Sequence, residues 1–381
     1  MSFEFPPKNF DKPTPLLGLE AKRVFVEDFD AVVAGFDGVI QETTVAFSQA
    51  RWPKVALEPW IFSLNGVAKA GVVVLVQRIP LNLGQIAVVK WGPILADEAA
   101  PEAKHIEFAT LSYLKAHYAV ERGMMLTVMP RAEAVTNAQT YDWLLAQKFD
   151  SAKPLPFPAR YQINVRLTDA DQRKSFQQKW RYHLNKAEKN GLHFELADAA
   201  DLPRFQKLYD AMTDRKNFPD YSAYHTLPDL FANLPQSLKP KLFFVTHEGK
   251  DVAGAVIFTA GRTAAYLYGA TNDQALPLRA GYLMHARIIS WLRDNSRTDW
   301  YDLGGTDGFQ GLHQFKKGMV GTAGRIINVP AHLNYAATTK ASFAGYGAYF
   351  LRDTVLRVRG LINMARGRYA KPDQVKDSEA A

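Results

Sequence analysis

The chain of 381 residues contains no cysteine and no long uncharged apolar run. The missing cysteine excludes disulfide bonds, thiolate metal sites and cysteine nucleophiles. No window approaches the roughly 18 consecutive apolar residues that a membrane-spanning helix needs. The N-terminus lacks a basic start followed by an apolar stretch, so we expect no secretory signal. These absences favour a cytoplasmic protein.

Several catalytic signatures are missing as well. The sequence has no G-x-S-x-G motif and no H-E-x-x-H motif, and its nine histidines include no pair four residues apart. The spacing from Gly66 to Gly71 resembles a phosphate-binding loop, but Val72 and Val73 stand where a lysine and a hydroxyl residue are needed. We therefore expect no hydrolase triad, no metal site and no bound cofactor.

What the chain does have is a globular composition with a basic surplus. Hydrophobic residues make up 47% and charged residues 22%, and the length suggests about two to three domains. Lysine and arginine number 46 against 38 acidic residues, which gives a net charge of +8. A surplus of this size favours an anionic partner such as phosphate, nucleic acid or an acidic membrane face.

A proline-rich segment near the middle divides the chain. Residues 151–158 carry three prolines, which interrupt helices and strand ladders and predict an extended connector. Before it, the Asn65-Gly66 pair between two apolar runs predicts a β-hairpin. The first half is expected to hold helices at 23–35, 101–119 and 138–147, and strands at 58–64, 71–78, 84–91 and 124–129.

The same order of elements recurs after the connector. A basic helix is expected at 171–190, closed by Gly191 as a C-cap. The other elements expected there are strands at 161–167, 192–196, 241–247, 252–259, 263–270 and 298–303, and helices at 200–216, 226–233 and 279–294. This repetition predicts an α+β protein with two domains of similar plan, each a mixed central sheet flanked by helices.

The C-terminal tail differs from both halves. Arg352, Arg359 and Arg366 are seven residues apart and fall in one line on a helix, beside an apolar stripe of Leu351, Val355, Val358 and Ile362. Two interpretations stay open. The helix docks on the protein body with a solvated basic edge, or it lies on an anionic bilayer.

Three local features of the second half could carry chemistry. The run from Gln178 to Gly191 combines aromatic side chains with four basic ones, which suits a nucleic acid, although an ordinary solvated helix face has the same pattern. Gly304-Gly305 ends a strand, where backbone can approach a ligand closely or simply turn. Lys316 follows that loop and could hold an oxyanion or phosphate, or be a surface lysine. The four basic residues are Lys179, Arg181, Lys186 and Lys189.

Taken in order, these motifs resemble those of the Fem family, the aminoacyl-tRNA-dependent transferases that build peptidoglycan interpeptide bridges. The resemblance spans about residues 45–335. It rests on Lys179 to Gly191 (K-x-R-x-x-x-N-K-A-x-K-x-G), Tyr266-Leu-Tyr-Gly-Ala-Thr271, Tyr301-Asp-Leu-Gly-Gly305, Phe315-Lys316 and, more loosely, Gln49-x-x-Trp52-x-Lys54 and Lys90-Trp-Gly-Pro93.

The resemblance implies two tandem GNAT-like acyltransferase domains. The first, residues 1–158 joined by about 328–345, would hold a muropeptide acceptor, as a UDP-MurNAc-pentapeptide or in its lipid-linked form. The second, 159–327, would bind aminoacyl-tRNA, and 346–381 would form the basic amphipathic tail. The protein would be a monomer in the cytoplasm, or peripheral at the inner face of the plasma membrane. The segment 192–240 is too short and too broken by proline for the helical tRNA arm of some members.

The resemblance also assigns roles to particular residues. Lys316 with Phe315 matches the pair placed at the reacting ester, and Tyr268 matches a tyrosine before the Gly-Ala turn. Two departures concern acceptor identity. Met129 stands where related enzymes often have an acidic residue facing the acceptor amine, and Tyr221 stands where a phosphate-binding arginine is expected. Arg215 could replace the arginine expected at position 221. The substrate-binding residues implied by the resemblance are Lys54, Trp52, Tyr268, Arg215, Tyr221, Tyr224, Gly304 and Gly305. The implied tRNA-binding residues are the four basic residues between 179 and 189.

The expected reaction needs little chemistry from the protein. An aminoacyl ester is already activated, so alignment of two large substrates and stabilisation of an oxyanion, a role for Lys316, suffice. Two alternatives remain. The first is an acyl-CoA-dependent N-acyltransferase of the GNAT class, whose glycine-rich pyrophosphate turn is poorly matched by Leu278 to Leu283 with its single glycine. The second is a non-catalytic RNA- or membrane-binding protein, which predicts no deep cleft between domains.

Overall fold

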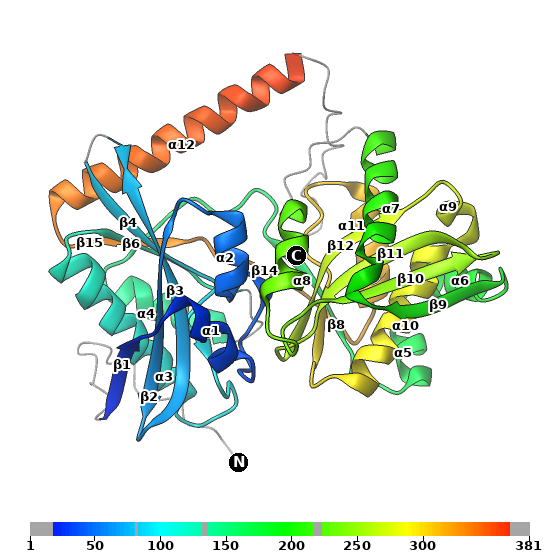
Figure 1. Ribbon diagram of the computed structural model, residues 1–381, viewed down its shortest axis with the longest axis horizontal. Coiled ribbons are helices and arrows are strands. Elements are labelled where there is room, and N and C mark those ends of the chain that lie inside the picture. The colour runs from blue at the N-terminus through cyan, green and yellow to red at the C-terminus, as the bar shows by residue number, and fades with distance from the viewer. Residues whose placement is uncertain (1–17, 81–82, 132–135, 217–222, 366–381) are drawn as a thin grey trace.

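The computed structural model describes residues 18–80, 83–131, 136–216 and 223–365. They form two α+β halves side by side, each built on one mixed β-sheet flanked by helices (Figure 1). The predicted fold class is confirmed. We call the part around the sheet that contains β2 the first half, and the part around the sheet that contains β10 the second half.

The first sheet has the strand order β1-β2-β3-β4-β6-β15-β7, with β5 paired to β3. All pairs are antiparallel except β4 with β6. Its strands are β1 (Leu19–Arg23), β2 (Ala56–Leu64), β3 (Val67–Ile79), β4 (Gly84–Lys90), β5 (Ile94–Leu95), β6 (Met125–Met129), β7 (Asp150–Ser151) and β15 (Leu333–Ala336). Its helices are α1 (Val26–Val33), α2 (Val45–Arg51), α3 (Ala103–Leu114), which continues as a π-helical turn over Lys115–Glu121, α4 (Thr136–Ala146) and α12 (Thr339–Ala365).

The second sheet has the order β14-β8-β13-β12-β11-β10-β9, and only β12 and β13 run parallel. Its strands are β8 (Ala159–Asn164), β9 (Leu192–Ala197), β10 (Lys241–His247), β11 (Lys250–Phe258), β12 (Thr263–Thr271), β13 (Trp300–Asp302) and β14 (Arg325–Asn328). Its helices are α5 (Asp169–Ser175), α6 (Gln178–Ala187), α7 (Leu202–Lys216), α8 (Leu227–Asn233), α9 (Ala275–Leu278), α10 (Ala280–Asn295) and α11 (Gln310–Val320).

Followed from the β1 edge and the β9 edge, the two sheets have the same plan with one exchange. In the second sheet the strand beside β13 is β8, which opens that half of the chain. In the first sheet the corresponding strand is β15, which the chain contributes only after the second half is complete. Leu333 and Asn334 of β15 are buried between β6 and β7. The C-terminal segment therefore completes the first sheet.

An apolar cluster joins the two halves. Phe29, Phe47 and Ile94 of the first half pack in one buried cluster with Leu230 and Phe258 of the second half. Helix α2 also contacts α8. Burial of apolar side chains from both sides fixes the relative position of the halves and so the shape of the space between them.

Two expected helices differ in the structure. The basic helix expected at 171–190 is two helices, because Phe176 and Gln177 are extended and the Gln177 N–H donates to the Gly318 carbonyl at 2.9 Å. The helix expected at 23–35 starts at Val26, since the residues up to Arg23 pair as an edge strand with β2. In both places, hydrogen bonds to distant segments outweigh local helix propensity.

Candidate active site

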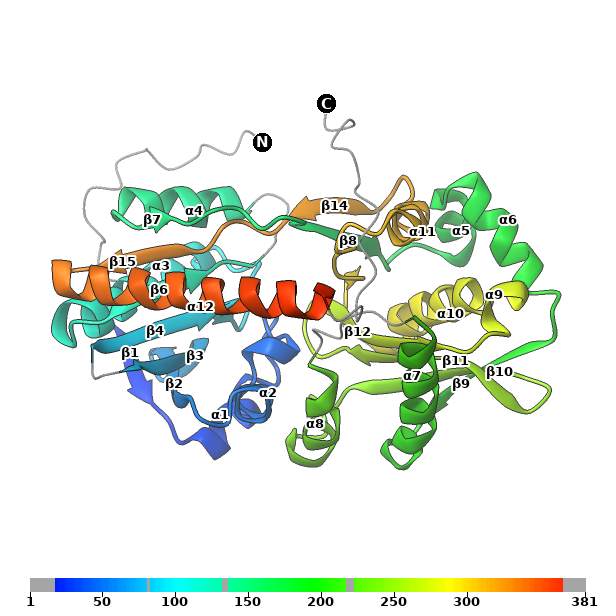
Figure 2. The same ribbon diagram turned by 90° about the horizontal axis from the view of Figure 1, so that it is seen from above.

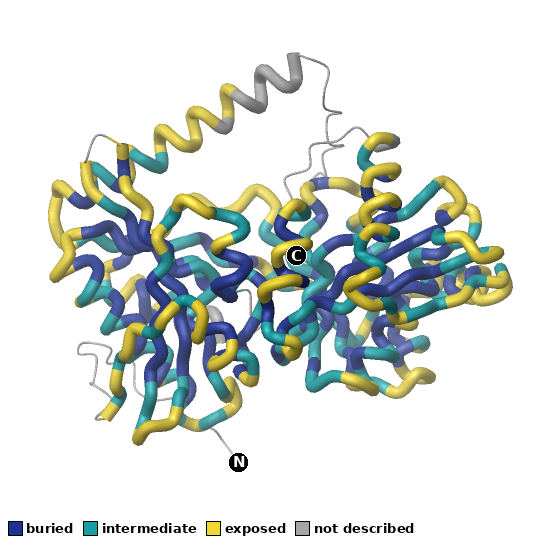
Figure 3. Tube along the Cα trace, viewed as in Figure 1, coloured by how far each residue is buried: buried dark blue, intermediate teal, exposed yellow. Residues whose placement is uncertain are grey.

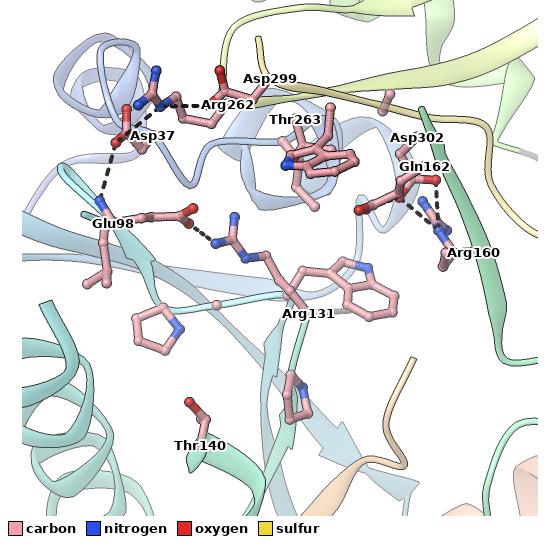
Figure 4. A pocket seen from close by; sticks show the side chains of 18 of the residues that line it. Asp37, Glu98, Arg131, Thr140, Arg160, Gln162, Arg262, Thr263, Asp299 and Asp302 are labelled. Carbon is pink, nitrogen blue, oxygen red and sulfur yellow. Dashed lines mark hydrogen bonds and ion pairs between the residues drawn. The ribbon is translucent and has the colours of Figure 1, made fainter. Parts of the chain in front are cut away.

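A cavity of about 400 Å³ lies at the junction of the two halves. The first half contributes the segment after β4, the start of α3 and the residues after β6, and the second half contributes β8, β12 and the end of β13. Figure 4 shows Glu98 and Arg131 on one side of this cavity and Arg160, Gln162 and Asp302 on the other. A ligand in it would touch both halves.

The lining carries charges of both signs. Its basic residues are Lys104, Arg131, Arg160, Arg262 and Arg325, and its acidic residues are Asp37, Glu42, Glu98, Glu107, Asp299 and Asp302. Nearly neutral as a whole, this lining suits a ligand that itself bears both ammonium and carboxylate groups.

On the first-half side, Arg131 is fixed by neighbouring groups. It donates to the Gly38 carbonyl at 2.7 Å and forms an ion pair with Glu98. Asp37 accepts a hydrogen bond from Arg297 at 3.0 Å, and burial raises the pKa of its carboxyl, an effect that Arg297 and Arg262 oppose. The Asp37–Arg297 contact ties the cavity wall of the first half to the second half.

On the second-half side, Asp302 is the buried centre of a hydrogen-bond network. Arg160 donates to both its carboxylate oxygens through Nε at 3.2 Å, and the Gly304 N–H donates at 2.7 Å. Within the part of the chain that the structure describes, the two terminal guanidinium nitrogens of Arg160 make no hydrogen bond. Arg160 is therefore held in place by Nε and keeps donors for a ligand.

Glu42 is the carboxylate of this cavity that is left without a partner. It lies in the short 3-10 turn Gln41–Thr43 and lines the cavity. Across the described ranges, nothing donates a hydrogen bond to it or forms an ion pair with it within 4.0 Å, although Lys90 and Arg160 are near enough to interact electrostatically. A carboxylate that is accessible and unpaired can take up a proton or hold an ammonium group.

Two aromatic side chains complete the lining. The Trp300 ring is covered by the Arg325 guanidinium at 3.8 Å. Trp91 follows β4 with φ 58°, a left-handed conformation that a bulky residue seldom adopts. Such strained residues are often found at functional sites, and here the strain lies in the cavity wall.

Among the residues predicted from the sequence, none that the structure describes lines this cavity. Lys316 is buried, and its Nζ donates to the carbonyls of Leu303 at 2.6 Å and Gly305 at 2.5 Å. Burial, with Arg160 nearby, lowers its pKa to about 8. Its amine thus holds the loop that follows β13, in which Gly304 has φ 74°. Phe315 packs against the buried cluster of the second half.

Among the predicted substrate-binding residues, Trp52 is the one that contacts a half-buried lysine. The Nζ of Lys90 lies 4.9 Å from the Trp52 ring centroid, and burial lowers the pKa of Lys90. Lys54 is exposed. Lys90 belongs to the Lys90-Trp-Gly-Pro93 motif, so the sequence contained an indication of this residue, although no role was predicted for it.

The other predicted residues are dispersed. Tyr268 is buried in a core with Tyr224, their rings 5.6 Å apart. The side chain of Arg215, at the end of α7, and the whole of Tyr221 lie outside the described residues. Lys179, Lys186 and Lys189 are exposed at α6, whereas Arg181 donates to the Lys174 carbonyl at 2.9 Å and serves the break between α5 and α6.

Comparison with known proteins supports the fold. Residues 174–317 match the family model of an acetyltransferase (GNAT) domain. A search of curated protein sequences found no match. The match lies within the second half, whose fold is thus similar to that of a GNAT acetyltransferase domain, and it does not extend over the first half.

Similar solved structures cover both halves. A crystal structure of FemX superposes with a TM-score of 0.68 at 15% identity, over 85% of this chain and 98% of that one. L-PGS from Bacillus licheniformis gives 0.53 at 12% identity, over 87% and 96%. The C-terminal domain (DUF2156) of a putative lysylphosphatidylglycerol synthetase from Agrobacterium fabrum gives 0.52 at 13% identity, over 86% and 97%. At these identities the likeness is one of fold.

Proposed function

We propose that the protein transfers an amino acid from a charged tRNA to the side-chain amine of a peptidoglycan precursor, in the cavity between its halves. The observation that carries this proposal is the lining itself, which mixes both signs of charge and leaves the Glu42 carboxylate unpaired within the described chain. A stem peptide, as UDP-MurNAc-pentapeptide or lipid-linked muropeptide, bears the matching ammonium and carboxylate groups.

Glu42 is the base that we assign to the reaction. The acceptor amine binds as an ammonium ion and gives one proton to the Glu42 carboxylate. Its nitrogen then attacks the ester carbonyl carbon and forms the amide bond as the bond to the ribose oxygen breaks. The second proton that the nitrogen loses in this step goes to the leaving ribose oxygen. In this role Glu42 replaces the acidic residue that related enzymes have at the position of Met129.

Arg160 is the donor that we assign to the oxyanion. Its Nε is held by Asp302, and its terminal nitrogens make no hydrogen bond in the described chain. A fixed cation in a partly closed cavity stabilises developing negative charge without reorganisation. Lys316 acts behind it as a positioning residue, because it holds the carbonyls next to the Asp302–Gly304 contact.

The deciding experiment is a transfer assay with several charged tRNAs and both forms of muropeptide. Glu42→Gln should lower kcat/KM about 100-fold, the scale of general-base catalysis. The matched control is Glu121→Gln, because Glu121 is an exposed carboxylate paired with His117. Near wild-type turnover of Glu42→Gln would show that Glu42 is not the base. No transfer by the wild-type protein with any pair of charged tRNA and muropeptide would reject the proposal.

A second candidate, acyl-CoA-dependent N-acyl transfer, is favoured by the acetyltransferase match over residues 174–317. Free thiol release from acetyl-CoA in the presence of an amine, unaffected by RNase, would favour it over the tRNA-dependent reaction. A non-catalytic RNA- or membrane-binding protein needs no cavity of about 400 Å³ between its halves, so this third interpretation has less support.

A further inference from the structure

Helix α12 is docked on the protein body through its N-terminal part alone. Ala344, Ala348 and Tyr349 pack against a buried cluster that contains Met125. A Cβ atom at Gly345 would lie only 2.4 Å from the sulfur of Met125, so glycine permits the close approach of the helix to the sheet. The Tyr349 hydroxyl also lies 2.6 Å from Thr127 Oγ1.

Beyond Tyr349 the helix leaves the protein surface. Figure 1 shows α12 rising away from the first half, and Figure 2 shows that it extends toward the second half above the junction. Every residue from Phe350 to Val358 whose side chain is described is exposed, and Figure 3 colours this part of the tube yellow. From Phe350 to Ala365 the helix continues for about 24 Å at 1.5 Å per residue.

The solvent-facing side of α12 carries large apolar side chains in both the docked and the projecting part. Phe343 is 82% exposed and Phe350 74%, and these residues are seven apart, along one line of the helix. Leu351, Val355 and Val358 are exposed as well and lie beside that line. The stripe predicted from the sequence is thus exposed as far as Val358, because the described contacts of α12 with the body end at Tyr349, before the stripe begins.

The same part of the helix is basic. Between Phe350 and Ala365 the chain has Arg352, Arg357 and Arg359 against one acidic residue, Asp353. Arg352 pairs with Asp353 at 2.8 Å, whereas Arg357 forms no ion pair with any described residue. Exposed apolar side chains together with a surplus of arginine are the pattern of helices that lie in the interface of an anionic bilayer.

We propose that α12 from Phe343 onward is a docking surface for an anionic lipid bilayer. The helix lies along the interface, with Phe343, Phe350 and Leu351 among the acyl chains and its arginines at the lipid phosphates. A second copy of the chain fits less well, because it would bring the same arginines together in a protein of net charge +8. No helix in the described ranges is both long and apolar enough to cross a membrane, so the contact is peripheral.

The test is co-sedimentation of the full chain with vesicles of phosphatidylglycerol and phosphatidylcholine, and with vesicles of phosphatidylcholine alone. The wild-type protein should bind the anionic vesicles, less at high salt. Phe350→Ser/Leu351→Ser should lower the partition coefficient at least tenfold, by about the transfer free energy of two large apolar side chains. Arg357→Gln should lower it about fivefold.

Leu276→Ser is the matched control, because Leu276 is 69% exposed on the second half. Thermal stability of each variant is measured alongside, and should not change for these exposed positions. Binding is read without donor or acceptor, so it is independent of the transfer reaction proposed above.

Three results would overturn the proposal. The first is no binding of the wild-type chain to anionic vesicles at low salt. The second is binding that is equal for neutral and anionic vesicles. The third is self-association of the wild-type chain that the Phe350→Ser/Leu351→Ser variant loses, which would assign the surface to a second copy.

Discussion

The two sheets share a strand plan but differ where their parallel strands meet. In the first half, β6 pairs along its whole length with Ile86–Lys90 of β4. In the second half, β13 pairs only with Thr263–Ala265, and β12 continues to Thr271 without it. The parallel strands of the first half therefore stay paired along β6, which we call the closed junction. Those of the second half separate after Ala265 and Asp302, which we call the open junction.

The side chains at the two junctions differ in the same sense. Val89, Leu126 and Val128 fill the closed junction and are fully buried apolar residues. The side chains at the open junction are those of Tyr266, His285, Tyr301 and Lys316. The ring centroids of Tyr266 and His285 lie 5.0 Å apart, and His285 also contacts the Tyr301 hydroxyl. One half therefore serves as a rigid wall, whereas the other keeps titratable groups directly behind the cavity.

The largest expected effect tests whether the first half depends on the strand that it borrows. Leu333→Ala in β15 should lower the free energy of unfolding by about 3 kcal/mol, the cost of emptying a buried leucine site. Leu276→Ala, at an exposed position, should change it by no more than about 0.5 kcal/mol. Chemical denaturation of both variants measures the difference, and equal stability would mean that β15 is dispensable.

Lys316→Met tests whether the open junction serves the reaction. Without the amine the Leu303 and Gly305 carbonyls lose their donor, and we expect transition-state stabilisation to fall by about 2 kcal/mol, roughly 30-fold in kcat/KM. Single-turnover kinetics with a charged tRNA measure this. Turnover near that of the wild-type protein would leave Lys316 with a purely structural role.

Lys316 also has a signature in alkaline solution. Its pKa is lowered from 10.5 to about 8 by burial. Between these values the unfolded chain holds a proton that the folded chain has lost, so stability due to this residue rises with pH, by up to about 1.4 kcal/mol per unit. The rise should be absent in Lys316→Met.

His285 gives the corresponding effect on the acid side. Burial, with Lys316 nearby, lowers its pKa from 6.5 to about 3. As the pH falls from 6.5 toward 3, the unfolded chain gains a proton that the buried imidazole does not, so stability present above pH 6.5 is lost by up to about 1.4 kcal/mol per unit. His285→Phe should flatten this part of the stability profile, at the cost of the 3.1 Å contact with the Tyr301 hydroxyl. An unchanged slope would contradict the burial of a neutral His285.

The smallest effect concerns tRNA. Lys179, Lys186 and Lys189 are exposed. If a lysine binds a tRNA phosphate, its replacement by alanine should lower the slope of log affinity against log salt concentration by somewhat under one. Arg181→Ala serves as the contrast, since Arg181 already donates to a backbone carbonyl and should alter stability rather than slope. If the variant with all three lysines replaced by alanine has an unchanged slope, α6 does not bind tRNA and is an ordinary solvent-exposed helix.

The sequence predicted the elements better than the site. The Asn65-Gly66 turn and the prolines of residues 151–158 act locally, and the hairpin of β2 and β3 and the connector before β8 follow from them. The cavity does not follow from such signals, because Glu42 and Arg160 come from opposite halves and meet only through packing at the apolar cluster between them. The Phe315-Lys316 motif directed attention to a residue one layer behind the cavity, and no spacing rule tells a side chain that faces a ligand from one that holds the loop beside it.

The position of β15 also fixes an order of events during synthesis. A ribosome makes β6 and β7 long before Leu333, so the nascent first half carries a sheet with a missing strand while the whole second half is still being made. Unpaired strand edges of this kind readily pair with other chains. The first half can therefore reach its native state only after the second half has been translated. For the same reason, the two halves cannot be separated by cutting the chain at the connector. A gene fragment that ends there would encode a first sheet without β15.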